Sequence, residues 1–134
     1  MGAARSLTDL GYLVCEEGDH VAAHSLYTEA LNIFCDLGYK RGVARLLEGF
    51  ACASARQGDH ERALKLAGAA AALRHNIRAP LRPGEQSKLE RNLQPAWAAL
   101  DAQAKAAWMS GWEMPVSEAL RQALERQTAA TRRS

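Results

Sequence analysis

Aromatic residues and cysteines are scarce in this chain of 134 residues. Aromatics make up only 6% of it, β-branched residues are few and alanine is abundant, which favours helix over sheet along nearly the whole sequence. The three cysteines, Cys15, Cys35 and Cys52, are odd in number and show no C-x-x-C spacing, so neither a disulfide framework nor a zinc knuckle is predicted. We therefore expect an all-α protein with reduced thiols.

Three further absences exclude classes of function. No apolar run approaches the ~20 residues that span a bilayer, and no basic start precedes an apolar core, so we expect a cytoplasmic chain without membrane contact. The net charge of +2 does not favour nucleic-acid binding by this chain alone. Because no glycine-rich phosphate loop is present, we expect neither ATP hydrolysis nor a bound cofactor.

What the chain does contain is an internal repeat. The segment 18–23, GDHVAA, returns forty positions later as 58–63, GDHERA. Large apolar residues replace large ones and small replace small outside that segment: Leu7 and Leu47, Leu10 and Phe50, Gly11 and Ala51, Leu26 and Leu66, Ala30 and Ala70, Ile33 and Leu73. A period of roughly 20–50 residues is typical of solenoids, in which each unit buries its apolar face on a neighbour.

Each unit has the pattern of a helix pair. In the first unit, 6–40, Gly18 can take the left-handed conformation that closes a helix, and Asp19 can cap the next one. Gly58 and Asp59 repeat these signals in the second unit, 46–75. The expected helices are 6–17, 19–36, 42–57 and 60–74.

The remaining third follows a break at 76–84, which contains two prolines and a glycine. We expect a helical segment over 85–110, kinked or divided near Gln94 by Pro95 and ended by Gly111, and a last amphipathic helix over 115–128. The length fits one domain, 1–134.

The first unit resembles the tetratricopeptide repeat (TPR). The residues that carry the resemblance are Leu7, Leu10, Gly11, Gly18, Ala23, Tyr27 and Ala30. It implies antiparallel helix hairpins stacked in a short right-handed α-solenoid, here with C-terminal capping helices. The second unit departs from the pattern, because Ala67 stands where an aromatic belongs and the period exceeds the usual ~34 residues.

The C-terminal third resembles the C-terminal repeat region of large bacterial transcriptional regulators of the LuxR and MalT type and of signal-transduction ATPases. The resemblance is carried by Leu73, Arg74, Pro80, Pro83, Trp108, Gly111, Met114, Glu118, Ala119 and Leu120, while Pro95 and Asp101 depart from it. It implies a regulatory module of a transcriptional or signalling regulator.

Two patterns leave an enzyme open as an alternative. His20 and His24 lie four apart, the spacing at which two imidazoles can share a metal, and Cys15 lies near His20. Packing explains them better, because the repeat places His20 and His60 at the same position and Leu64 stands where a second histidine would recur. We expect no metal site and no catalytic residue.

The leading hypothesis is a non-catalytic scaffold that binds a protein or peptide in a helical groove. The first and third helices would line it, and the candidate partner-binding residues are Asp9, Tyr12, Glu16, Arg45, Glu48, Arg56 and Trp112. Trp108 is assigned to the core and Trp112 to an exposed anchor, since tryptophan is enriched at binding hot spots.

Two alternatives concern regulation and assembly. A ligand-binding sensor that controls oligomerisation would be distinguished by a pocket-sized apolar cavity. A homodimer could form through the uncapped ends of the solenoid, unless Val116, Leu120 and Leu124 fold back onto the helix 60–74 and the segment 85–110.

Overall fold

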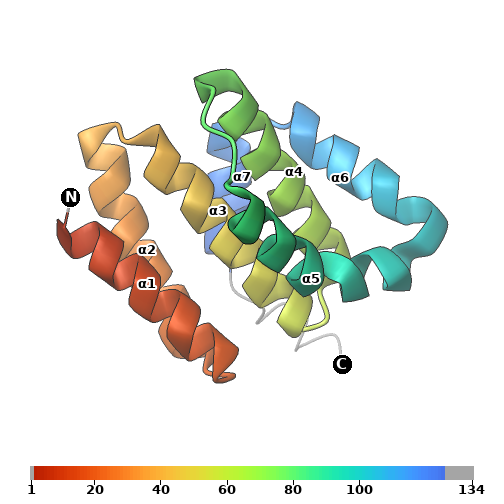
Figure 1. Cartoon of the computed structure of the whole chain (residues 1–134), viewed down its shortest axis with the longest axis horizontal. Helices are drawn as coiled ribbons and strands as arrows, with labels where there is room; N and C mark the ends of the chain where they lie inside the picture. Colours follow the sequence, from red (N-terminus) through yellow and green to blue (C-terminus); the bar gives the residue numbers. More distant parts are fainter. Residues whose placement is uncertain (1, 126–134) are drawn as a thin grey trace.

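A computed structural model describes residues 2–125, and the described residues are helical with no strand among them. The all-α prediction is confirmed. The elements in chain order are α1 (Gly2–Glu16), α2 (His20–Leu37), α3 (Lys40–Arg56), α4 (His60–Ile77), α5 (Pro83–Leu100), the short 3-10 helix η1 (Asp101–Gln103), α6 (Ala104–Glu113) and α7 (Val116–Leu124). Figure 1 shows two helix pairs, α1 with α2 and α3 with α4, followed by the three C-terminal helices. None of the helices among these residues has the length and apolar content needed to cross a membrane.

The two hairpins end and begin as the repeat predicts. Gly18 and Gly58 have φ values of 92° and 84°, a conformation that glycine adopts without steric cost. Asp19 then accepts a hydrogen bond from the Ala22 amide at 3.0 Å, and Asp59 accepts one from the Arg62 amide at 3.3 Å. Both carboxylates therefore cap the second helix of their hairpin.

The hairpins contact each other mainly through α2 and α3, and Tyr27 lies at the centre of this junction. The Tyr27 ring is fully buried between Gly11 on α1 and Gly49 on α3. A Cβ added at Gly11 would lie 2.5 Å from Tyr27 Cε1, and one at Gly49 would lie 2.9 Å from Tyr27 Cζ. Only glycine leaves room for the aromatic ring at these positions. Phe50 adds an edge contact, with ring centroids 5.2 Å apart.

Helix α6 packs directly on α4 through two glycines. A Cβ added at Gly68 would overlap the carbonyl oxygen of Trp108, and one at Gly111 would overlap the carbonyl oxygen of Lys65. The two backbones touch at this crossing. The prediction that Gly111 ends a helix is therefore wrong: Gly111 lies buried inside α6, which continues to Glu113, because the residue is needed for close packing rather than for a turn.

Of the two forms expected near Gln94, a bend or a division, the division into two helices does not occur. Helix α5 runs through Pro95 to Leu100, and the chain breaks at Asp101, which has a φ of 49°. Pro95 and Gln94 lie on the exposed side of α5, where water can reach the carbonyl that loses its helical donor. Only Leu93 and Ala96 of α5 are buried, so this helix is attached to the body along a narrow strip.

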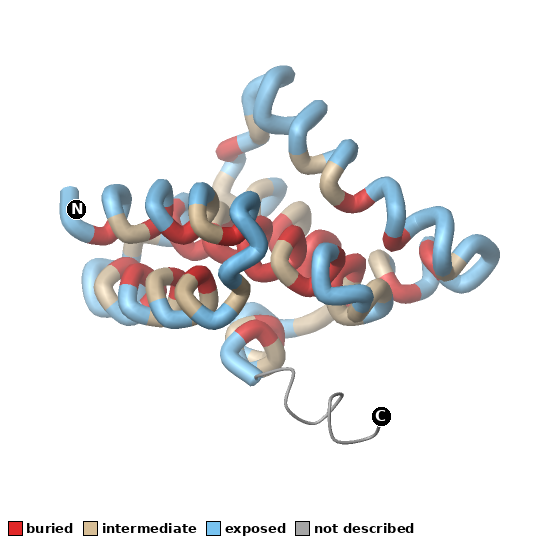
Figure 2. The backbone as a smooth tube through the Cα atoms, turned by 90° about the horizontal axis from the view of Figure 1, so that it is seen from below, coloured by how far each residue is buried: buried red, intermediate tan, exposed pale blue. Residues whose placement is uncertain are grey.

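Helix α7 packs on α3 and α4 through Ala119 and Ala123, with Leu120 partly buried against the same core. This meets one half of the capping hypothesis, the return onto the helix 60–74, but the main contacts of α7 do not include the segment 85–110, and Val116 and Leu124 remain 36% and 37% exposed. Positions 126–128 of the predicted helix 115–128 lie outside the described residues. Figure 2 shows the buried positions concentrated on the inner sides of the packed helices.

Candidate functional site

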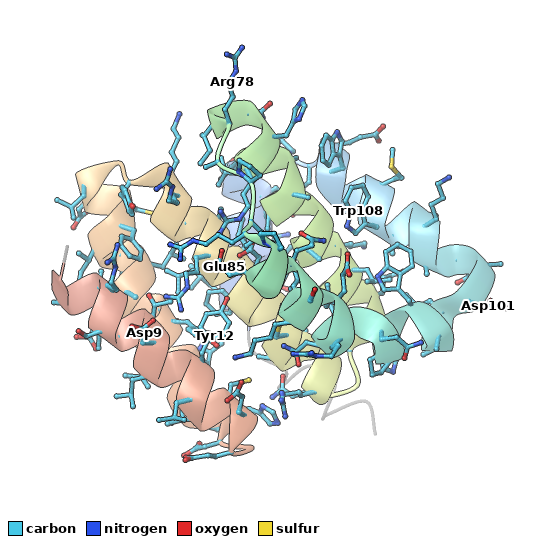
Figure 3. All side chains as sticks on the ribbon, viewed as in Figure 1. Asp9, Tyr12, Arg78, Glu85, Asp101 and Trp108 are labelled. Atoms are coloured by element: carbon cyan, nitrogen blue, oxygen red, sulfur yellow. The ribbon has the colours of Figure 1, made fainter. Side chains whose placement is uncertain are left out.

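Three of the predicted partner-binding residues on α1 and α3, Tyr12, Arg45 and Glu48, line a small crevice. The Arg45 guanidinium forms an ion pair with Asp9 at 2.8 Å and lies 4.9 Å from the centroid of the Tyr12 ring. The Tyr12 hydroxyl donates to the Arg45 carbonyl at 2.7 Å, and Figure 3 shows Asp9 and Tyr12 on α1. These side chains are thus bound to one another.

Helix α5 forms the far wall of this crevice, which has a volume of about 190 Å³. Lys88 on α5 pairs with Glu16 on α1 at 3.1 Å, so the predicted residue Glu16 joins two helices. Arg56 lies exposed at the C-terminal end of α3 and is not part of the crevice lining.

Glu48 is the buried member of the predicted set. Its carboxylate accepts two bonds from Arg74 on α4, Nε to Oε2 at 2.5 Å and Nη2 to Oε1 at 3.1 Å. Arg74 also donates to the carbonyl of Ala79 at 2.9 Å, which fixes the connection from α4 to α5. Burial raises the pKa of the Glu48 carboxyl, and Arg74 partly opposes this rise. The bidentate geometry keeps both charges paired in a site with little access to water.

The three thiols are held in their protonated form. Burial raises the pKa of Cys15 and raises that of Cys52 to about 12, so both thiols are protonated at neutral pH. Cys35 is exposed, and burial of part of its side chain raises its pKa as well. Among residues 2–125, no three His, Cys, Asp or Glu side chains are grouped closely enough to hold a metal ion.

A second and larger hollow lies between α4, α5 and α6, and we call it the groove. Its volume is about 1200 Å³. Each helix contributes a stripe of residues spaced three or four apart, as one face of a helix requires. The stripes are Ala67, Ala71, Arg74, His75 and Arg78 on α4, then Gln86, Leu89, Glu90, Leu93, Gln94 and Trp97 on α5, and Lys105, Trp108, Met109 and Trp112 on α6, with Pro80, Leu81 and Glu48 at one edge.

The lining of the groove is largely aromatic and aliphatic. Trp108 and Trp112 stack with ring centroids 5.3 Å apart, and Figure 3 shows Trp108 on the side of α6 that faces α4 and α5. Trp97 and Met109 are 38% and 40% exposed, so the groove is open to solvent. Trp112 does not lie in a turn as predicted: it belongs to α6 and is half-buried, because α6 extends past Gly111. Trp108, assigned to the core, is half-buried and packs against the core.

The groove occupies the place where the second repeat unit lacks the large side chains of the first. Tyr27, Leu31 and Phe34 are buried on α2, and the positions forty residues later are Ala67, Ala71 and Arg74 on α4. All three of the later residues line the groove. Two small side chains and one charged side chain therefore stand where the first unit fills its core.

This substitution is the sequence signal that could have located the site. The departure at Ala67 is visible in the sequence, but an alanine at a packing position is equally consistent with closer helices. The contribution of α5 and α6 has no such signal, because it depends on how far α5 stands from α4. Trp112 is the one predicted residue on the α6 wall, and Glu48 touches both hollows.

Comparison of the chain with protein-family models, with curated proteins and with solved structures found no match, so the function must be inferred from the groove and the crevice themselves.

Proposed function

We propose that this protein is a non-catalytic interaction module of TPR-like design, and that the groove binds an amphipathic helix of a partner protein. The supporting observation is the arrangement of three helical stripes around one unfilled volume. Each stripe presents the spacing with which a helix packs on another helix, so the hollow has the lining of a bundle that lacks one member.

The dimensions of the groove fit such a partner. The α5 stripe from Gln86 to Trp97 covers about three helical turns, or ~16 Å at 1.5 Å per residue. The volume of about 1200 Å³ exceeds the ~300–1000 Å³ typical of small-molecule pockets. Stacked tryptophans supply the large apolar contact area that dominates helix-in-groove binding.

The cellular role belongs to the same proposal. The resemblance of the C-terminal third supports a regulatory or sensor part of a transcriptional or signalling regulator, and the free cysteines fit a cytoplasmic setting. Binding of the partner helix to the groove would carry the regulatory signal.

Site-specific photo-crosslinking tests the proposal. A photoreactive amino acid at Met109, in the groove, is expected to crosslink a partner through a segment with helical apolar periodicity. The control position is Val21, which is 72% exposed on α2. The double variant Ala67→Tyr/Ala71→Leu restores the side chains of the first unit and should abolish the crosslink while the protein stays folded.

Three outcomes contradict the proposal. Equal crosslinking from Val21 would show that the groove is not selective. A crosslink that persists in the filled variant would place the partner elsewhere. A fatty acid such as dodecanoate that raises the unfolding temperature of the wild type but not of the filled variant, without any crosslinked protein, would favour the ligand-sensor alternative.

A further inference from the structure

The charged side chains around the groove are not balanced. Five of them line it: Arg74, Arg78 and Lys105 are cationic, and Glu48 and Glu90 are anionic. Glu48 and Arg74 neutralise each other through their two hydrogen bonds. Two cations and one carboxylate remain at the exposed rim.

The two rim cations stand at opposite ends of the groove. Arg78 caps the C-terminal end of α4, whereas Lys105 lies in the first turn of α6, which follows η1. Figure 3 shows Arg78 at the top of the view, with its side chain directed away from the body, and Asp101 at the right-hand edge. Glu90 lies between them on α5, where its Oε2 accepts a hydrogen bond from the Gln86 side chain at 2.9 Å.

From this arrangement we infer that the partner helix is acidic at both ends, with carboxylates in its first and last turns and an apolar face between them. The inference rests on the proposed function and specifies the chemistry of the partner. A helix of about three turns that lies along the α5 stripe would bring one terminal carboxylate to Arg78 and the other to Lys105. Its apolar face would contact Trp97, Trp108 and Met109.

A partner with basic ends would meet like charges. Like-charge contacts at an interface reject the wrong partner more strongly than complementary rim charges attract the right one. The groove should therefore select by charge among helices that have equivalent apolar faces.

A helical peptide library provides the test, with the whole chain as the target. Peptides of about 14 residues, ~21 Å as a helix, carry a fixed leucine face and either Glu, Gln or Lys in the first and last turns. We expect Glu peptides to be enriched. Arg78→Glu/Lys105→Glu should weaken the selected peptide about tenfold in Kd, equal to ~1.4 kcal/mol, and should reverse the preference toward Lys peptides.

Two controls separate this inference from the proposed function. Arg41→Glu changes an exposed cation on α3 outside the groove and should leave the affinity unchanged. Ala67→Tyr/Ala71→Leu should abolish binding of every peptide class. Enrichment of Gln or Lys peptides that bind only the unfilled groove would overturn the acidic inference and leave the groove function standing. Absence of any peptide that depends on an open groove would overturn both.

Discussion

Glu48 is a carboxylate with almost no access to water, held by a single guanidinium. Its side chain is 6% exposed and that of Arg74 is 11% exposed. Burial penalises the charged form of an acid, whereas the two hydrogen bonds from Arg74 favour it. The first effect is the larger, so the pKa of Glu48 lies above its ordinary value.

This direction fixes how Glu48 couples stability to pH. The folded protein takes up a proton at Glu48 at a higher pH than the unfolded chain does, so this residue adds stability as the pH falls from above the raised pKa to the ordinary glutamate range near ~4.3. Compared with Glu48→Gln, the wild type should gain about 1.4 kcal/mol in unfolding free energy per unit of pKa difference across that window. Urea unfolding at a series of pH values measures it.

Glu61→Gln is the matched control, because the Glu61 side chain is 67% exposed in its pair with Lys65. The difference in unfolding free energy between Glu61→Gln and the wild type should change little over the same pH range. A wild type that loses stability relative to Glu48→Gln on acidification would show that the ion pair outweighs burial.

Alanine at a repeat position has opposite consequences on the two helices of the second hairpin. Ala51 is the repeat equivalent of the small residue Gly11 and supports close packing. Ala67 and Ala71 are the repeat equivalents of Tyr27 and Leu31, and their small side chains leave the groove unfilled. The residue type alone does not distinguish these cases. The consequence of an alanine depends on whether a neighbouring helix packs closely against it, and α5 does not pack closely against Ala67 and Ala71.

Helix ends illustrate what local sequence can predict. Caps and left-handed glycines act within one or two turns, so Asp19, Asp59, Gly18 and Gly58 could be assigned their roles before the structure was known. Gly111 could not, because a glycine that ends a helix and one that admits a crossing backbone look alike in sequence. The need for glycine at a crossing depends on α4, whose contact residue Lys65 lies more than forty residues before Gly111.

The first cap gives a prediction at this scale. Asp19→Ala should lower the unfolding free energy by about 1 kcal/mol, since α2 loses the acceptor for the Ala22 amide. Asp19→Asn keeps an acceptor oxygen and should restore most of the loss. Chemical denaturation compares the three proteins, and an Asn variant as unstable as the Ala variant would contradict capping by this side chain.

The crossing of α4 and α6 gives a second prediction. Gly68→Ala should lower the unfolding free energy by about 1–3 kcal/mol or more, because the added methyl group must displace the α6 backbone. Gly84→Ala introduces the same methyl in the first turn of α5, where nothing lies within 4 Å. Thermal unfolding should show a lower midpoint for the first variant only. Equal midpoints would mean that α6 is not held against α4 at this distance.

At the scale of the whole molecule, one arginine on α4 holds the last described helix. The Arg62 guanidinium donates to the carbonyls of Gln122, Ala123 and Glu125 at the C-terminal end of α7. A cation at this end also interacts favourably with the helix dipole. These hydrogen bonds hold α7 against α3 and α4.

Removing this link should free α7 without unfolding the rest. Arg62→Ala is expected to weaken the attachment by about 2 kcal/mol, which corresponds to roughly 30-fold faster amide exchange in α7. Hydrogen exchange with mass spectrometry resolves that segment from α1 and α2. Arg121→Ala is the control, because its exposed ion pairs with Glu118 and Glu125 lie within the C-terminal segment itself. Unchanged α7 protection in Arg62→Ala would contradict the link.

The whole arrangement was predictable only in part. The repeat indicated two contacting hairpins, and the structure contains them. The stacking of later elements was not predictable, because α5, α6 and α7 contact α4 on different sides and no periodic pattern specifies which side each takes. The groove results from the positions that α5 and α6 take around α4.

The chromophores of this protein divide between its two halves. Tyr12, Tyr27 and Tyr39 all precede α4, while Trp97, Trp108 and Trp112 all line the groove, and the sequence contains no others. Indole emission therefore reports on the C-terminal half alone, whereas far-ultraviolet circular dichroism averages over every helix. If both optical signals follow one denaturation curve, the hairpins and the groove unfold as a single cooperative unit.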